Sequence, residues 1–186
     1  LACGATTGSG CHRGHGVTRI SSGEIDDLIG AMARETRTWL KRTGRADPLM
    51  IGIHTGGLWV AKRLQRELAI DAPVGELNIA FYRDDFSRIG IHPRVAPSHL
   101  PLAVDDRHLV LVDDVLNTGR TIRAAMNEIF DWGRPASICL AVLIERGGRE
   151  LPIQADVVGR RLDLHPDEHV KLTGPEPLAL EIKKSE

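Results

Sequence analysis

The sequence predicts an α/β fold in which helices flank a central, mostly parallel sheet. Residues 109–112 form an apolar run without alternation, as expected for a strand that is buried on both faces. A loop of small residues and a helical pattern follow this run, and the same order recurs after residues 49–53. Repeated units of strand, loop and helix are typical of a parallel sheet.

The length of 186 residues suits one domain with a sizeable core. We expect residues 18–186 to form this domain and residues 1–17, rich in Gly, Ser and Thr, to be a disordered extension. The formal net charge of −1 disfavours a strongly basic nucleic-acid-binding chain but leaves room for a local basic patch. No apolar run approaches the roughly 20 residues that span a bilayer, so no membrane contact is expected. The odd number of cysteines, three, favours a reducing, cytoplasmic location.

The first element is an amphipathic helix. Ser21 to Glu24 has the form of a capping box, and an apolar stripe continues to a stop near Gly44. The second half of this helix is basic, which fits a solvated face and, less well, a binding face. Residues 49–53 then predict a short buried strand, and a second helix follows the loop at residues 54–57.

A long connection comes next. Leu77, Ile79 and Phe81 alternate, so they predict a strand with one face more exposed. Residues 84–106 contain three prolines and no clear periodicity. So long a connection in a compact domain is usually functional or disordered.

The last third of the chain predicts further strands. Residues 136–144 form an apolar segment in which Cys139 is expected to be a core residue. Residues 155–159 predict the next strand, and residues 165–173 and 178–182 are expected to be edge strands.

The most informative stretch is residues 109–121, where the apolar strand stops at Asp113 and Asp114. A small-residue loop and a helix N-terminus follow, and the orphan N–H groups and partial positive charge of such a terminus suit a phosphate. The two carboxylates would repel that phosphate, but they could accept hydrogen bonds from the 2′ and 3′ hydroxyls of a ribose. The stretch therefore predicts a site for a ribose 5-phosphate unit.

Two other interpretations of this stretch compete. A strand that ends in two aspartates can be a Walker B element that holds Mg²⁺, but the chain lacks the accompanying G-x-x-x-x-G-K-[S/T] string. Alternatively, the aspartates are a solvated strand end, and Thr118 or Thr121 only caps the helix. The agreement of strand, acids, glycine and helix within one string favours the ligand site.

The string Val-Asp-Asp-Val-Leu-x-Thr-Gly-Arg-Thr at residues 112–121 resembles the phosphoribosyl pyrophosphate (PRPP) signature of type I phosphoribosyltransferases. Its Asp-Asp-Val-Leu variant is most similar to the PyrR family, pyrimidine operon regulators that are also uracil phosphoribosyltransferases. Residues 82–85 and 145–159 are similar to that family too, and the resemblance extends from about Ile25 to the C-terminus. It implies a type I phosphoribosyltransferase fold with a flexible hairpin lid that closes over PRPP.

The resemblance also implies roles for individual residues. Asp113 and Asp114 would fix the ribose hydroxyls and stabilise the charge that develops at the sugar C1 as pyrophosphate leaves. Arg83 and Arg88 of the hairpin are the cations for the departing pyrophosphate, although each could be an incidental charge of a solvated loop. Uracil would lie at Val157, Val158 and Gly159, largely against backbone groups. The 5′-phosphate is expected at the loop and helix start, which consist of Val115, Leu116, Asn117, Thr118, Gly119, Arg120 and Thr121.

A second phosphate-compatible loop is needed if the ligand carries pyrophosphate. His54-Thr55-Gly56-Gly57 resembles the pyrophosphate loop of the family, often written Thr-Arg-Gly, and this resemblance assigns Thr55, Gly56 and Gly57 to it. Because Gly56 holds the place of the arginine, a cation is missing, and we expect weak pyrophosphate affinity and weak turnover. His54 could replace part of that charge or be an ordinary loop residue.

The implied reaction converts uracil and PRPP to UMP and pyrophosphate. Mg²⁺ is expected mainly on the PRPP oxygens, with Asp113 and Asp114 as candidate ligands. The family binds pyrimidine operon mRNA on a basic surface of its dimer, so we expect a homodimer or higher homo-oligomer. Arg146, Arg149 and Arg160 are candidate RNA-binding residues, although a solvated charged edge explains them equally well. Two alternatives remain, a phosphoribosyltransferase for a purine base and a catalytically weak regulator that senses UMP.

Overall fold

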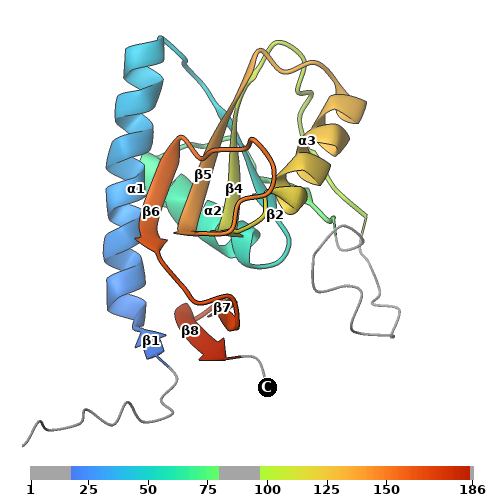
Figure 1. Ribbon diagram of the computed structural model, residues 1–186. Coiled ribbons are helices and arrows are strands. Elements are labelled where there is room, and N and C mark those ends of the chain that lie inside the picture. Colours follow the sequence, from blue (N-terminus) through green and yellow to red (C-terminus); the bar gives the residue numbers. More distant parts are fainter. Residues whose placement is uncertain (1–17, 80–96, 185–186) are drawn as a thin grey trace, which may run out of the picture.

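The computed structural model of the protein describes residues 18–79 and 97–184, which fold into three layers (Figure 1). The middle layer is a five-stranded sheet in which every pairing is parallel. Its order is β3-β2-β4-β5-β6, and its strands are β2 (Leu49–Ile53), β3 (Gly75–Leu77), β4 (His108–Leu116), β5 (Ser137–Arg146) and β6 (Val157–Leu162). The predicted α/β fold with a parallel central sheet is confirmed.

Helices cover both faces of the sheet. The two helices α1 (Ser22–Thr43) and α2 (Gly56–Leu68) lie on one side, and α3 (Arg120–Trp132) lies on the other (Figure 1). The predicted ends of α1 are confirmed, because Ser21 and Glu24 form a capping box and Gly44 ends the helix with a φ of 67°.

Successive side chains of β4 point to opposite faces of the sheet, which explains the apolar run. Val110 and Val112 belong to the core under α1 and α2, whereas Leu109 and Leu111 belong to the core under α3. Cys139 is fully buried in the first of these cores, and burial raises the pKa of its thiol to about 12. It is a core residue, as predicted, because a protonated thiol is a poor nucleophile.

The order of the strands creates a switch point between β2 and β4. From β2 the chain moves outward through α2 to β3, and it then returns to β4 on the other side of β2. Ligands of open α/β sheets bind beyond the carboxyl ends of the strands at such a point. The ends of β2 and β4 are therefore the expected ligand site.

A second, smaller sheet contains β1 (Thr18–Ile20), β7 (Glu168–Thr173) and β8 (Ala179–Lys184) in the antiparallel order β1-β8-β7. Figure 1 shows β7 and β8 beyond the carboxyl end of β6. The prediction of edge strands for these C-terminal segments is correct for β7, which is at the edge of this small sheet, but wrong for β8, which lies between β1 and β7. Leu172 and Leu180 face one another across β7 and β8 and are buried in the core under α1 and α2, so the hairpin is held by this core and by β1.

Three further predictions concern the strand at residues 77–81, the hairpin lid and the N-terminal extension. The strand predicted at residues 77–81 overlaps β3 only at Leu77, since residues 78 and 79 are not in a strand, and residues 80 and 81 lie outside the described residues. The hairpin lid with Arg83 and Arg88, and the N-terminal extension at residues 1–17, lie outside the described residues. In the described ranges, no helix combines the length and the apolar character needed to cross a membrane.

Candidate functional site

Asp113 and Asp114 stand at the switch point, but inside β4 rather than at its end. Pairing of β4 with β2 stops at Val112, whereas pairing with β5 continues to Leu116. The prediction that the strand stops at the two acids is therefore wrong, because the neighbouring strand β5 carries the ladder past them. The acids are the first residues of β4 without a β2 partner, and this lost partner opens one side of the strand.

Asp113 is the one charged side chain that is buried in the described part of the chain, with 1% of its surface exposed. Its Oδ1 accepts a hydrogen bond from the backbone N–H of Asp114 at 3.0 Å. Asp114 is only partly buried. Burial of a carboxylate costs free energy unless it is compensated, so this position indicates a function rather than a contribution to stability.

The loop after β2 lies directly against the two acids. A Cβ at Gly57 would come within 2.7 Å of the Val112 carbonyl oxygen and 3.0 Å of Asp113 Oδ1. A Cβ at Gly56 would come within 2.5 Å of the Asp114 carboxyl carbon. A side chain at Gly57 would meet backbone atoms, whereas a side chain at Gly56, the place of the expected arginine, would require the Asp114 side chain to turn away.

The predicted phosphate loop connects β4 to α3. Gly119 is the N-cap of α3 with a φ of 92°, a backbone conformation that favours glycine, and no side chain caps this helix. The Oγ1 atom of Thr118 accepts a hydrogen bond from the backbone N–H of Arg120 at 3.2 Å. Thr118 precedes the N-cap residue Gly119, so this bond is not a regular N-cap. The N-terminus of α3 is therefore suited to an external anion, and the phosphate site at this loop stays a prediction.

Residues 149–153 form an outer strap over this loop. The backbone N–H groups of Glu150 and Leu151 both donate to the Thr118 carbonyl, at 3.1 and 3.0 Å. The guanidinium of Arg120 donates twice to Glu150 Oε2, at 3.1 and 2.6 Å. Because Arg120 is paired with the strap, the predicted phosphate site would consist mainly of backbone amides and hydroxyls.

Comparison with known proteins agrees with this geometry. Residues 21–175 match the phosphoribosyl transferase domain family. The chain is 62% identical to the bifunctional protein PyrR of Nitrosococcus oceani over 161 residues, which cover 86% of this chain and 91% of that protein. It is 57% identical to the bifunctional protein PyrR of Pseudomonas aeruginosa over 157 residues, which cover 84% of this chain and 92% of that protein.

The chain belongs to the PyrR family. The predicted family is thus confirmed. Solved structures support the fold, since the hypoxanthine phosphoribosyltransferase of Trypanosoma cruzi matches with a TM-score of 0.63 at 21% identity, covering 89% of this chain and 95% of that one. A purine phosphoribosyltransferase from Pyrococcus horikoshii matches with a TM-score of 0.59 at 27% identity, covering 77% and 86%. The predicted type I phosphoribosyltransferase fold is confirmed as well.

The strand predicted to hold uracil in this PyrR-family protein is the edge strand β6. Register places Val158 level with Val142 and Asp113, two strands from the acids, or about 10 Å. The side chain of Val157 is fully buried, and a Cβ at Gly159 would meet the Leu143 carbonyl oxygen at 2.5 Å. Of the three residues predicted to hold uracil, only Val158 therefore has an accessible side chain.

The three arginines predicted as an RNA surface of the family differ in their surroundings. Arg149 is exposed and donates to the Ile153 carbonyl at 3.3 Å, and Arg160 lies 3.9 Å from Glu24 with 38% of its side chain exposed. Nε of Arg146 is buried and has no hydrogen-bond partner in the structure. Arg149 is the most exposed of the three, and Arg146 and Arg160 are both partly exposed.

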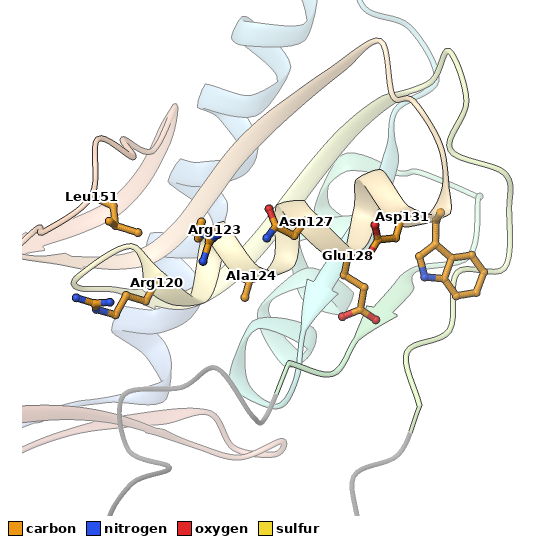
Figure 2. A pocket seen from close by; sticks show the side chains of 8 residues that line it. Arg120, Arg123, Ala124, Asn127, Glu128, Asp131 and Leu151 are labelled. Carbon is orange, nitrogen blue, oxygen red and sulfur yellow. The ribbon is translucent and has the colours of Figure 1, made fainter.

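A shallow hollow of about 620 Å³ runs along α3 from Arg120 to Trp132, as Figure 2 shows. Its lining carries both signs of charge, with Arg120 and Arg123 at one end and Glu128 and Asp131 at the other. Neither Asp113 nor Asp114 lines it. The hollow is therefore a surface of α3 beside the phosphate loop, not the ribose site.

Sequence reasoning missed three side chains that support the two loops, namely Glu76, Lys62 and Glu150. Each acts through an ion pair with a residue 14 or more positions away in the chain. No local motif marks such residues. The Arg120–Glu150 pair could have been suspected from opposite charges alone, but its geometry depends on how the strap folds back over Thr118.

Proposed function

We propose that this protein transfers the phosphoribosyl group of PRPP to uracil, which gives UMP and pyrophosphate, and that it regulates pyrimidine genes by binding RNA. The buried Asp113 and the partly exposed Asp114, beside two helix N-termini at the switch point, carry the catalytic half of the proposal. Membership of the PyrR family supports uracil over a purine base.

The site supplies three actions in this reaction. The amides at the start of α3 and the Thr118 hydroxyl bind the 5′-phosphate. The carboxylate of Asp114 accepts hydrogen bonds from the ribose hydroxyls, and Asp113 holds the backbone of Asp114 through its N–H. As the bond from C1 to pyrophosphate breaks, positive charge develops on the sugar, and the two carboxylates stabilise it.

Mg²⁺ is the expected cofactor of this reaction. Within the described ranges, no three His, Cys, Asp or Glu side chains converge to form a protein-only cage. This fits an ion that is held by one or two carboxylates, here Asp114 and Asp113, together with phosphate oxygens of the substrate. When bound with PRPP, the ion supplies positive charge that neutralises the leaving pyrophosphate.

The Asp113→Asn variant tests the catalytic proposal. Asparagine has almost the same shape and can still accept from the Asp114 N–H, so the fold is expected to persist. Loss of the negative charge should lower kcat at least about 100-fold. The measurement is the rate of UMP formation from uracil and PRPP, and Tm is the control for folding. Near-wild-type turnover would contradict the assignment.

Substrate choice needs its own test. We expect uracil to support PRPP consumption, while hypoxanthine and guanine do not. Faster turnover with hypoxanthine than with uracil would replace the pyrimidine assignment with the purine alternative.

The regulatory half of the proposal rests on the accessible arginines and on family membership. We propose that a homodimer binds pyrimidine operon mRNA through a surface that includes Arg149 and Arg160. Arg149→Ala should weaken RNA binding and reduce its salt dependence, because a phosphate contact is lost, while UMP formation is unchanged. RNA affinity that is equal in the variant and the wild type, or that does not respond to salt, would remove this half of the proposal.

A further inference from the structure

Helix α3 carries its charges in the reverse of the order that stabilises a helix. Arg120 and Arg123 lie in its first turn, whereas Glu128 and Asp131 lie toward its end, as Figure 2 shows. The helix macrodipole favours acids at the start and bases at the end. Helix α1 follows this rule, with an acid in its first turn and two bases in its last. The charges of α3 therefore oppose its own dipole.

The spacing of these charges adds repulsion along the helix. Arg120 and Arg123 are three residues apart, and so are Glu128 and Asp131, so each like-charged pair is adjacent on the helix surface. In the described part of the chain, none of Arg123, Glu128 and Asp131 forms an ion pair, while Arg120 pairs with Glu150 of the strap. A partner with acids beside the start of α3 and bases beside its end would relieve both effects.

Large aromatic side chains are exposed at the acidic end of α3. Phe130 and Trp132 are 55% and 50% exposed, and they are two of the three large apolar side chains exposed in the described ranges. Exposed aromatic residues are enriched where a protein surface is covered by a partner. A phosphate at the start of α3 would account for Arg120, but not for acids and rings about 16 Å away along the helix axis.

The charged face of α3 is complementary to itself when the helix is reversed. Arg120 and Asp131 are equally far from a point between positions 125 and 126, and so are Arg123 and Glu128. Two antiparallel copies of α3 that cross at this point would place the basic end of each helix beside the acidic end of the other. A two-fold interface requires such self-complementarity, whereas a foreign partner does not. The pattern therefore favours a second copy of this chain as the occupant of the face.

The middle of the same face allows a second helix to approach. Arg120, Ala124, Asn127 and Asp131 recur at intervals of four, three and four residues, which places them on one side of the helix. Ala124 is small and only 7% exposed, so it leaves the hollow shallow at its centre. Asn127 is exposed beside it and could hydrogen-bond across the two-fold axis.

We propose that α3 pairs with α3 of a second copy of this chain, in antiparallel orientation about a two-fold axis. The inference goes beyond the homodimer proposed above because it names the surface and the register, and it depends on neither the reaction nor RNA. The 13 residues of α3 span about 20 Å, and stable interfaces bury about 1,200–2,000 Å². We therefore expect reversible association that weakens as NaCl rises from about 0.05 M to about 0.5 M, because salt screens the charges.

The test exchanges one charge of each sign between two proteins. Arg123→Glu and Glu128→Arg each place like charges level with one another in the antiparallel pair, so each should weaken self-association at least about tenfold in analytical ultracentrifugation. An equimolar mixture should associate like the wild type, because every charge on α3 then meets its opposite. Arg66→Glu, an equal charge change at an exposed position of α2, is the matched control and should associate like the wild type.

Thermal unfolding of the dilute proteins separates this role from a structural one. Arg123→Glu puts an acid in the first turn of α3, and Glu128→Arg puts a base near its end beside Asp131. Both changes follow the dipole and replace a like-charged neighbour with an opposite one, so neither should lower Tm. Loss of association together with an unchanged or raised Tm is the expected result.

A disulfide between two copies tests the surface directly. Asn127→Cys would be made with Cys3→Ser and Cys11→Ser, so that the buried Cys139 is the one other thiol. Mild oxidation should link this protein into dimers, because near the two-fold axis two cysteines come within the about 4.4–6.8 Å between Cα atoms that a disulfide needs. Arg66→Cys in the same background should remain unlinked.

The inference is overturned if the wild type shows no association, or if Arg123→Glu and Glu128→Arg associate as strongly as the wild type does. It is also overturned if the mixture restores nothing, because α3 then does not face a second α3. No substrate is present in these measurements. A protein that shows the expected pattern but makes no UMP would refute the proposed reaction and retain the α3 interface, and the converse result would do the opposite.

Discussion

The two strand, loop and helix units at the switch point look alike in sequence but are held in different ways. The loop at residues 54–57 packs against the acids of β4, so that a Cβ at Gly57 would meet backbone atoms and a Cβ at Gly56 would displace the Asp114 side chain. The loop at residues 117–119 leaves 3.4 Å between a Cβ at Gly119 and its nearest neighbours, and the outer strap braces it from the far side. The loop at residues 54–57 is thus shaped by its contacts with the two acids. The loop at residues 117–119 is shaped by its own backbone conformation and by the outer strap at residues 149–153.

The largest effect that separates the two loops is expected from Gly57→Ala. The new Cβ would meet backbone atoms of Val112 and Asp113, which cannot swing aside as a side chain tip can. The start of α2 and the acids must move apart, and a misplacement of about 1 Å can cost about 100-fold in rate. Measurement of kcat/KM for PRPP checks this, and a loss smaller than tenfold would mean that the contact is not important for catalysis.

Gly119→Ala is the matched change in the other loop and should have a smaller effect. Its Cβ has space, so the cost is the left-handed backbone conformation alone, about 1–2 kcal/mol for a residue with a Cβ. We expect a Tm lower by several degrees and a kcat/KM reduced less than in Gly57→Ala. The reverse ranking of the two variants in kcat/KM would break the comparison.

Glu150→Gln probes the strap and should have a still smaller effect. The Arg120–Glu150 pair is about half exposed on both sides, and such pairs contribute about 0–1 kcal/mol. We expect unfolding free energy to change by less than 1 kcal/mol and KM for PRPP by no more than a few-fold, because two backbone bonds still hold Thr118. A loss as large as that of Gly119→Ala would show that the ion pair, rather than the backbone, braces the loop.

The smallest expected effect is a pH dependence of stability that concerns only the loop at residues 54–57. Burial tends to raise the pKa of Glu76, but hydrogen bonds from His54 of this loop and from Lys62 outweigh burial and lower it. The lowered pKa of Glu76 means that its stabilising contribution is complete above its ordinary value of 4.5 and is lost as pH falls below it. Thermal unfolding of the wild type and Glu76→Gln should therefore differ at pH 7 and converge toward pH 4. A Tm difference that persists unchanged at pH 4 would mean that the carboxylate of Glu76 does not hold its charge as we infer.

Local patterns account for the features that the sequence predicts well. The capping box at Ser21, the stop at Gly44 and the apolar run before Asp113 depend on neighbours in the chain, and each is confirmed. The string at residues 112–121 identified the family because its strand, acids and helix start are contiguous. The contact of Gly56 with Asp114 could not be foreseen, because it joins residues 58 positions apart and depends on how two loops pack.

The errors also have a common physical origin. The sequence shows polarity at Asp113 and therefore suggests a strand end, but β5 continues the hydrogen bonding to Leu116. Both C-terminal segments are predicted as edge strands, but β8 pairs with β1 as well as with β7, so only β7 is at an edge. In both cases the partner strand, which is remote in the chain, decides the outcome.

The burial of Asp113 has a consequence for attempts to make this protein more heat-resistant. Burial at 1% exposure imposes a desolvation cost on a charge, and a neutral residue of equal size that keeps the hydrogen bond from the Asp114 N–H avoids this cost. Selection for thermal survival alone would therefore accept replacements at position 113 and enrich robust proteins that no longer turn over substrate. Directed evolution of this scaffold needs a screen in which activity is measured after heating.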